Sequence, residues 1–290
     1  MDRRQFLATA AAGITASAAG CVEAFESAAE TTYGREPPLV DPRPEAVYWP
    51  THTEQMTMAG MGTTDDGRRV SLSYTFPHRF WRVFRGDDGG YESRMFEVEA
   101  DDAVHLMANV WDAETGVVLP VSSVDIAVTG GNNVDERETI YPMLSQRMGF
   151  HYGDNYHLDG DGGYTARVTV GGVTADRYGD FESRLAEPET VDIAFEYSEQ
   201  ARNELEFTEY EQAGEAGAVE PMAMDGMSMD GMAMDGMSMG GMPMGTVQEP
   251  GGTAMGEALA DDIRYRASLL EDERFGGPYL AVTAATRYNE

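Results

Sequence analysis

The chain has 290 residues, with 51 acidic side chains against 20 basic ones that are all arginine, and a formal net charge of −31. This charge excludes nucleic acid as a partner, because the phosphates would be repelled. The single cysteine, Cys21, leaves the folded part without a disulfide, a thiolate nucleophile or a cysteine metal ligand. An acidic surface with arginine as its only fixed cation resembles the proteins of halophilic archaea, in which high salt screens the repulsion.

The first twenty residues have the pattern of an export signal. Arg3 and Arg4 precede an apolar run that ends just before Cys21. We interpret residues 1–20 as a twin-arginine lipoprotein signal peptide and Cys21 as its lipidation site. The lipid would hold the mature chain at the extracytoplasmic face of the cell membrane, since no later segment is long enough to span a bilayer. Residues 21–45 are acidic and proline-bearing, which predicts an extended tether.

Residues 46–200 are predicted to form the folded domain. Short segments in which apolar and polar residues alternate recur between clusters of Gly, Asp and Asn, and no segment shows a helical stripe. Alternation with period two indicates strands that are buried on one face. The region is therefore predicted to be all-β, an antiparallel β-sandwich. The clearest segments surround Val70, His105, Ile126, Val168 and Ile193.

Histidine and methionine carry the candidate chemistry, because no phosphate-binding loop, nucleophile elbow or HExxH motif is present. Imidazole and thioether together are typical copper ligands. His105 and Met107 are two residues apart on a predicted strand, so their side chains share a face. His78 lies among large apolar residues and is predicted to be structural. A non-metal interpretation stays open, since methionine often fills cores and histidine is often a hydrogen-bonded structural residue.

Three stretches carry a family resemblance: "AVYWPTHTEQMTMAGMG" at 46–62, "AVHLMANVWDAETGVVLP" at 103–120 and "YPMLSQRMGFHYGDN" at 141–155. They resemble the periplasmic ferrous-iron transport proteins, a family of metal-binding lipoproteins and secreted proteins that includes a treponemal membrane antigen. The chain would be a haloarchaeal lipoprotein form of that family. The resemblance implies an immunoglobulin-like sandwich, commonly a dimer, that binds copper together with iron or manganese.

The resemblance also implies the ligands. The family's methionine falls on Met143, and its two histidines fall on His105 and His151. Met107 stands where the family has a glutamate and is expected as a fourth ligand, which softens the site and favours copper over iron. Three other residues bear on the ligand set. Tyr178, after Arg177, stands where the family has a further histidine, and His52 and His157 are the candidates to replace that ligand.

Residues 201–256 are acidic and glycine-rich and are predicted to be a linker that contains a methionine-rich repeat at 222–244. The repeat unit is Met-x-Met-Asp/Gly-Gly, whose glycines disfavour a helix. Thioethers bind Cu(I) at any pH, so the repeat is predicted to collect Cu(I); an inert linker or a sink for oxidants is the alternative. Its methionines are Met222, Met224, Met227, Met229, Met232, Met234, Met237, Met239, Met242 and Met244.

Residues 257–290 contain "YLAVTAATRY", a predicted strand that could return to an edge of the sandwich. The sequence as a whole predicts a non-enzymatic cell-surface lipoprotein that binds copper, ferrous iron or both, for metal acquisition or homeostasis. A metal permease and a second copy of the chain are the expected partners. A copper chaperone unrelated to iron and a structural surface domain without metal are the alternatives. Since free imidazole has a pKa of about 6.5, metal affinity is expected to fall below that pH.

Overall fold

The computed structural model describes residues 38–131, 134–222, 227–228, 251–272, 277–286 and 288. The predicted signal peptide with Arg3 and Arg4, the lipidation site Cys21 and most of the tether lie outside these residues. Most of the methionine-rich repeat also lies outside them. Within the described part of the chain, no helix is long and apolar enough to cross a membrane.

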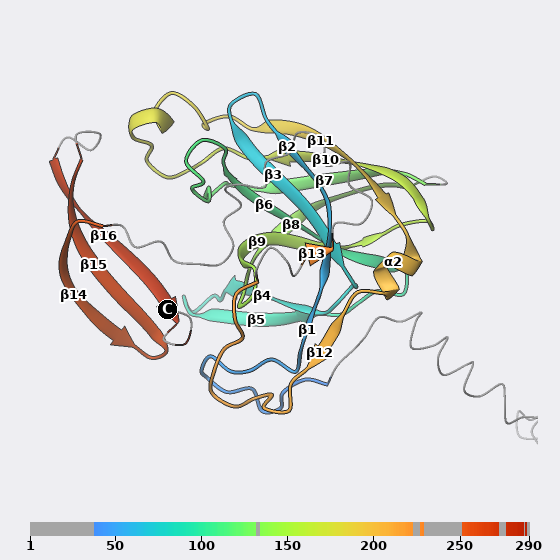
Figure 1. The fold of residues 1–290 in the computed structure, drawn as a ribbon, viewed down its shortest axis with the longest axis horizontal. Coiled ribbons are helices and arrows are strands. Elements are labelled where there is room, and N and C mark those ends of the chain that lie inside the picture. The colour runs from blue at the N-terminus through green and yellow to red at the C-terminus, as the bar shows by residue number, and fades with distance from the viewer. Residues whose placement is uncertain are drawn as a thin grey trace, which may run out of the picture. The chain divides into compact units, whose positions relative to one another are not determined.

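The main body is an antiparallel β-sandwich, which confirms the predicted fold class (Figure 1). Strand β8 belongs to both layers, because it pairs with β7 as far as Ile140 and with β9 from Tyr141 onward. The first layer contains β11 (Glu189–Tyr197), β10 (Gly162–Val170), β7 (Val124–Gly130) and the start of β8 (Val134–Ser145). The second contains the end of β8, then β9 (Gly149–His157), β6 (Asp102–Asp112), β3 (Arg68–Thr75) and β2 (Met56–Thr63).

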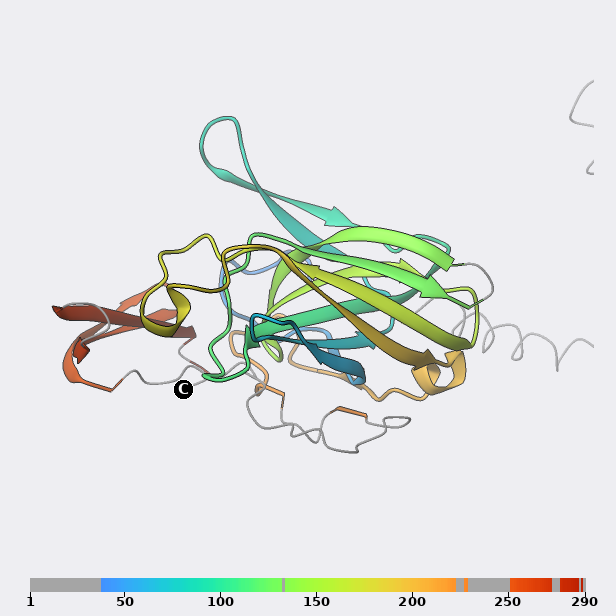
Figure 2. The same cartoon turned by 90° about the horizontal axis from the view of Figure 1, so that it is seen from above.

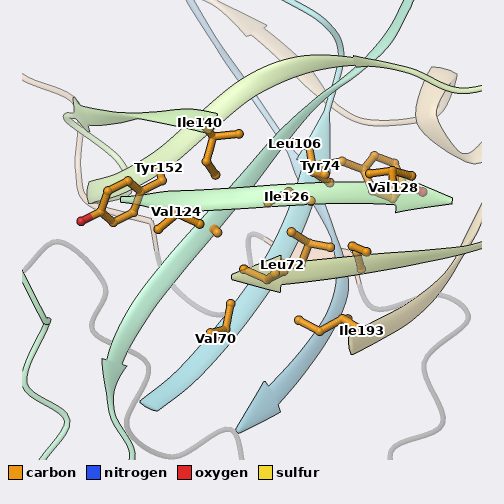
Figure 3. Packing of buried hydrophobic residues seen from close by; sticks show 14 of the residues in the cluster. Val70, Leu72, Tyr74, Leu106, Val124, Ile126, Val128, Ile140, Tyr152 and Ile193 are labelled. Atoms are coloured by element: carbon orange, nitrogen blue, oxygen red, sulfur yellow. The ribbon is translucent and has the colours of Figure 1, made fainter. Parts of the chain in front are cut away.

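The core lies between the two layers and is built by the alternation seen in the sequence. On β3 and β6 the even-numbered residues point inward, as Leu72 and Leu106 do, and they meet Ile126 of β7 (Figure 3). Each fully buried aliphatic side chain of this size stabilises the fold by about 1.5–3 kcal/mol. The five strands predicted from alternating segments are β3, β6, β7, β10 and β11, and all five are confirmed.

The odd-numbered residues of β3 and β6 point away from this core, yet they are also buried. They include Ser73 of β3 and both His105 and Met107 of β6. Part of their cover is the hairpin of β4 (Phe80–Arg85) and β5 (Tyr91–Phe96), which extends out from the sandwich in Figure 2. Phe80 lies at the base of this hairpin, and its ring centroid is 5.8 Å from that of His105. We call this buried second surface the outer face.

Part of the predicted linker at 201–256 is packed against the sandwich. Helix α2 (Glu199–Asn203) is followed by β12 (Phe207–Glu209), which pairs with β1 (His52–Glu54). Leu205 and Val219 are both only 3% exposed. Isolated apolar residues in an acidic, glycine-rich sequence show no periodicity. The alternation of apolar and polar residues therefore could not predict that Leu205 and Val219 are buried against the sandwich.

The C-terminal residues form a sheet of their own. The predicted strand at "YLAVTAATRY" is β16, but it pairs with β15 and not with an edge of the sandwich. At the edge, the two-residue strand β13 (Met227–Ser228) pairs in parallel with β2. The remaining elements are β14 (Thr253–Ala260), β15 (Ile263–Asp272), β16 (Gly277–Thr286) and the short 3-10 helix η1 (Gly179–Phe181).

Candidate metal centre

Three of the predicted ligands lie together on the outer face. Met143 of β8 is directly opposite His151 of β9. His105 of β6 is opposite Asn155 of β9, four residues further along the same strand. Because side chains two and four residues apart on a strand point to the same side, His151 and Asn155 face the same way. The sandwich therefore places two imidazoles and one thioether over three adjacent strands.

Asn155 determines which nitrogen of His105 carries a proton. Its amide is oriented by the backbone of His78: the Asn155 Nδ2 donates to the His78 carbonyl at 3.1 Å, and the His78 N–H donates to Oδ1 at 3.3 Å. The same Oδ1 lies 2.9 Å from Nδ1 of His105. A carbonyl oxygen only accepts, so Nδ1 of His105 must be the protonated donor. Its Nε2 then carries a lone pair.

That Nε2 is buried and has no hydrogen-bond partner among the described residues. A buried polar atom without a partner is costly unless something else satisfies it. Gly153 leaves a space beside this nitrogen. A Cβ at Gly153 would lie 2.6 Å from Nε2 of His105 and 3.3 Å from Sδ of Met143. The imidazole lone pair and the thioether thus border the same small space, which the missing side chain keeps open.

His151 has the same arrangement of its ring nitrogens. Its Nδ1 lies 3.1 Å from the carbonyl oxygen of Gly149, which can only accept, so Nδ1 is protonated and Nε2 is free to bind a metal. Burial lowers the pKa of His151 from 6.5 to about 4. Burial, and to a lesser degree the nearby His78, lowers the pKa of His105 well below its usual value. Both rings are therefore neutral at pH 7, which is the form that binds metal ions.

Two further histidines lie near these ligands. The ring of His78, predicted to be structural, has its centroid 4.0 Å from that of His105, and its Nδ1 lies 3.2 Å from the Arg79 carbonyl oxygen. His52 stacks on Phe207 at 4.9 Å between ring centroids. Burial, and then the charge of His78, lowers the pKa of His52 to about 4. The structure thus gathers four of the five histidines, His78 included, in one electrostatically connected group.

His157, the other proposed replacement ligand, is not part of this group. It is exposed, its Nδ1 lies 2.8 Å from the Asp101 carbonyl oxygen, and six residues of extended strand, about 20 Å, separate it from His151. Tyr178 is 47% exposed, just before η1. The role of His157 as a replacement ligand stays a prediction, which its exposure and its distance from His151 along the strand do not favour.

Met107 lies on the same face as His105, as predicted, and is directly opposite Gly153 of β9; its side chain packs with four other buried methionines. Over the residues that the structure describes, no three His, Cys, Asp or Glu side chains are placed to hold a metal ion. A centre here would therefore combine imidazole and thioether. His105, His151 and Met143 could supply it, and Met107, opposite Gly153, stays the predicted fourth ligand.

The sequence matches no protein-family model and no curated protein. The structure is similar to that of FetP from a uropathogenic E. coli strain, with a TM-score of 0.36 and 20% identity over 50% of this chain and 97% of FetP. A copper-bound variant of FetP gives a TM-score of 0.36 and 20% identity over 49% of this chain and 97% of that one. A copper-bound variant of Campylobacter jejuni P19 gives 0.37 and 18%, over 49% of this chain and 97% of P19.

Three residues of the site were not expected from the sequence: Gly153, Asn155 and His78. Gly153 and Asn155 stand in the "HYGDN" segment already singled out, at alternate positions after His151. Strand periodicity would have placed them on the ligand face, where a glycine indicates close approach and an amide indicates a hydrogen bond to a ligand. His78 lies on a loop, where no periodicity predicts its direction.

Proposed function

We propose that the chain binds a copper ion through Nε2 of His105, Nε2 of His151 and Sδ of Met143. The observation that carries the proposal is the buried, unpartnered Nε2 of His105, which borders the space at Gly153 together with Sδ of Met143. Both imidazoles have their other nitrogen held by an acceptor. Such hydrogen bonds orient a ligating ring and raise its basicity.

The donor set supports copper over ferrous iron. Imidazole binds Cu(II), and thioether binds Cu(I), whereas Fe(II) prefers a site that includes carboxylates. Met107 stands where the resemblance leads one to expect a carboxylate, and the described residues place no acidic side chain with the histidines in a metal-binding group. The proposed cargo is therefore copper in either oxidation state.

In this proposal the copper is cargo, and the chain itself performs no covalent chemistry. The net charge of −31 gives a negative field that attracts cations to the protein. The lipid at Cys21 would keep the domain at the extracytoplasmic face of the membrane, where it would deliver metal to a permease or another membrane partner. Pairing of two copies, as the resemblance implies, belongs to the same proposal.

Titration of the full-length chain with Cu(II) tests the proposal. The variants His105→Ala and His151→Ala should lose the tight Cu(II) equivalent and its visible absorbance, while Met143→Leu should weaken Cu(I) more than Cu(II). His157→Ala is the matched control and should bind copper as the unmodified protein does. Full copper stoichiometry in both His105→Ala and His151→Ala would contradict the proposal and favour a structural domain without metal.

A second measurement separates copper acquisition from the iron function that the resemblance implies. The protein is loaded with equal concentrations of Cu(II) and Fe(II) under anaerobic conditions, and the bound metals are counted. Copper alone in the His105-dependent site would support a copper carrier unrelated to iron. Iron in that site, lost in His105→Ala, would show that the soft donors do not decide the metal.

A further inference from the structure

Five methionines form a second buried cluster, separate from the main core. We call this group, with the partly buried Met61 packed against it, the methionine cluster. The aliphatic and aromatic core between the layers contains no methionine in the described part of the chain. The buried methionines thus lie on the outer face, where Phe80 is also buried, and none lies in the core between the layers. The buried members are Met56, Met58, Met107, Met148 and Met222.

The strand register explains how thioethers from different strands meet. Met58 of β2 is opposite Ser73 of β3, and Ser73 is opposite Met107 of β6. Ser73 is small, so the two methionines can extend toward each other above it, across about 10 Å of sheet. In the next row Met61 is opposite Ser71, whose partner on β6 is Asn109. The middle strand β3 thus contributes a serine opposite each of these β2 methionines.

Two more members are held over the sheet from outside it. Met148 lies in the turn between β8 and β9, and its N–H donates to Oγ of Ser145 at 3.0 Å. The N–H of Met222 donates to the Arg147 carbonyl oxygen at 2.9 Å. Met222 is only 3% exposed even though it ends a glycine-rich acidic segment. Backbone hydrogen bonds therefore fix two thioethers above those of β2 and β6.

From this arrangement we infer that the methionine cluster is a binding site for a soft monovalent metal ion, Cu(I) in the cell. Methionine fills irregular cores because it is flexible, but a filler would not be confined to one face and absent from the other. Thioethers are neutral, soft ligands that hold Cu(I) without losing a proton. A single positive charge also costs less to bury than a divalent one.

The cluster adjoins the imidazole centre, and its other members lie away from that centre. Met107 is two residues from His105 on the same face of β6, a separation of about 7 Å along the strand, and it is opposite Gly153 of β9. Met222 is also the first methionine of the repeat at 222–244, and β13 pairs with β2 at Met56. The cluster therefore lies between the start of the repeat and the imidazoles, where it can take Cu(I) from one and pass it to the other.

Titration of the full-length chain with Ag(I), a redox-inert soft monovalent ion, tests this inference. The readout is the NMR signal of each methionine methyl group, assigned through single Met→Leu variants. The first equivalent should shift the methyl signals of Met58, Met107 and Met148, while those of Met95 and Met255 remain unchanged. Leucine nearly matches methionine in volume, so Met58→Leu/Met107→Leu should stay folded and lose this first equivalent.

Met95→Leu/Met255→Leu is the matched control and should keep the first equivalent, because neither residue belongs to the cluster. If the cluster variant does not fold, Met58→Leu and Met107→Leu are compared singly. Cluster signals that stay fixed while repeat methionines respond, or equal Ag(I) uptake by both double variants, would overturn the inference. His105→Ala/His151→Ala should lose Cu(II) yet keep the Ag(I) response, so failure of the imidazole centre is seen separately.

Discussion

Gly153 has no side chain, and this keeps the space beside Nε2 of His105 open. We predict that Gly153→Ala weakens copper binding strongly, because its Cβ would lie 2.6 Å from Nε2 of His105 and must displace the ring. Overpacking of this kind costs about 1–3 kcal/mol of stability, which a folded domain survives. Calorimetric titration with Cu(II) measures the loss.

Gly277→Ala is the control for that variant, because a Cβ there meets no atom within 4 Å. It should bind copper with unchanged affinity and unfold at the same temperature. Tight Cu(II) binding by Gly153→Ala, with the His105 ring unmoved in its NMR spectrum, would show that the space beside Gly153 is not where the ion binds.

The buried imidazoles make the metal-free protein sensitive to acid. Burial lowers the pKa of His151 to about 4, whereas the unfolded chain titrates near the ordinary value of 6.5. Between these values the unfolded state binds a proton that the native state does not, so the free energy of unfolding falls as the pH drops from about 6.5 to 4. Urea unfolding at a series of pH values should show this decline, and His151→Gln should show a smaller one.

A decline in His151→Gln that equals that of the unmodified protein would place the acid sensitivity elsewhere.

The same lowered pKa changes the pH range over which we expect copper to bind. Free imidazole predicts competition from protons below about 6.5, but a buried ring with a pKa of about 4 is still neutral at pH 5. Copper affinity should therefore persist through mildly acidic pH and fail only near pH 4.

At the scale of strands, Arg68 joins the two layers. It is fully buried at the start of β3, and it donates to the carbonyl oxygens of Val170 at 3.2 Å and Glu187 at 2.7 Å. Asp66 lies 3.2 Å from the same guanidinium. We predict that Arg68→Leu destabilises the fold by about 3 kcal/mol, because it leaves buried acceptors and a carboxylate without their partner. Urea denaturation measures the difference.

Arg167→Leu is the matched control, since its ion pair with Asp192 is solvent-exposed and such pairs contribute little. It should unfold at nearly the same urea concentration as the unmodified chain. If Arg68→Leu unfolds there too, the guanidinium bridge between the layers is not what holds them together.

Alternation in the sequence predicted the strands that line the main core, and it failed where other forces set the pattern. β2 carries Gly60 and Gly62 because Ile193 and Val191 of β11 approach them closely, and these glycines interrupt the alternation. β8 is rich in charged residues in its first half and lies in two layers, so neither half shows a long apolar stripe. Close approach between strands and a change of layer depend on tertiary structure, so the local periodicity of the sequence cannot predict them.

The candidate site shows the same division. The shared face of His105 and Met107 follows from period two, and the pairing of Met143 with His151 followed from the family resemblance. The packing of Met107 with the methionine cluster did not, because Met148 and Met222 of that cluster come from segments distant in sequence. A sequence pattern says which face a side chain occupies, whereas only the packed chain says which neighbour it meets.

At the scale of the whole molecule, the net charge of −31 repels itself in dilute buffer. Raising the salt from about 0.1 M to about 1 M shortens the screening length from roughly 10 to 3 Å. We predict that the melting temperature rises steadily over this range and continues to rise in more concentrated salt. Circular dichroism during heating provides the measurement, and a melting temperature that stays level or falls would refute the halophilic interpretation of the surface.

In strands β3 and β6 the residues at even-numbered and odd-numbered positions have different roles. Inward residues such as Leu72 and Leu106 hold the layers together, and outward residues such as His105 and Met107 face the imidazoles and thioethers. If the proposed copper site is correct, its ligands could therefore be exchanged at odd-numbered positions while the inward residues keep the core. Evolution, or a protein engineer, could then change the metal preference of such a site without redesigning the fold.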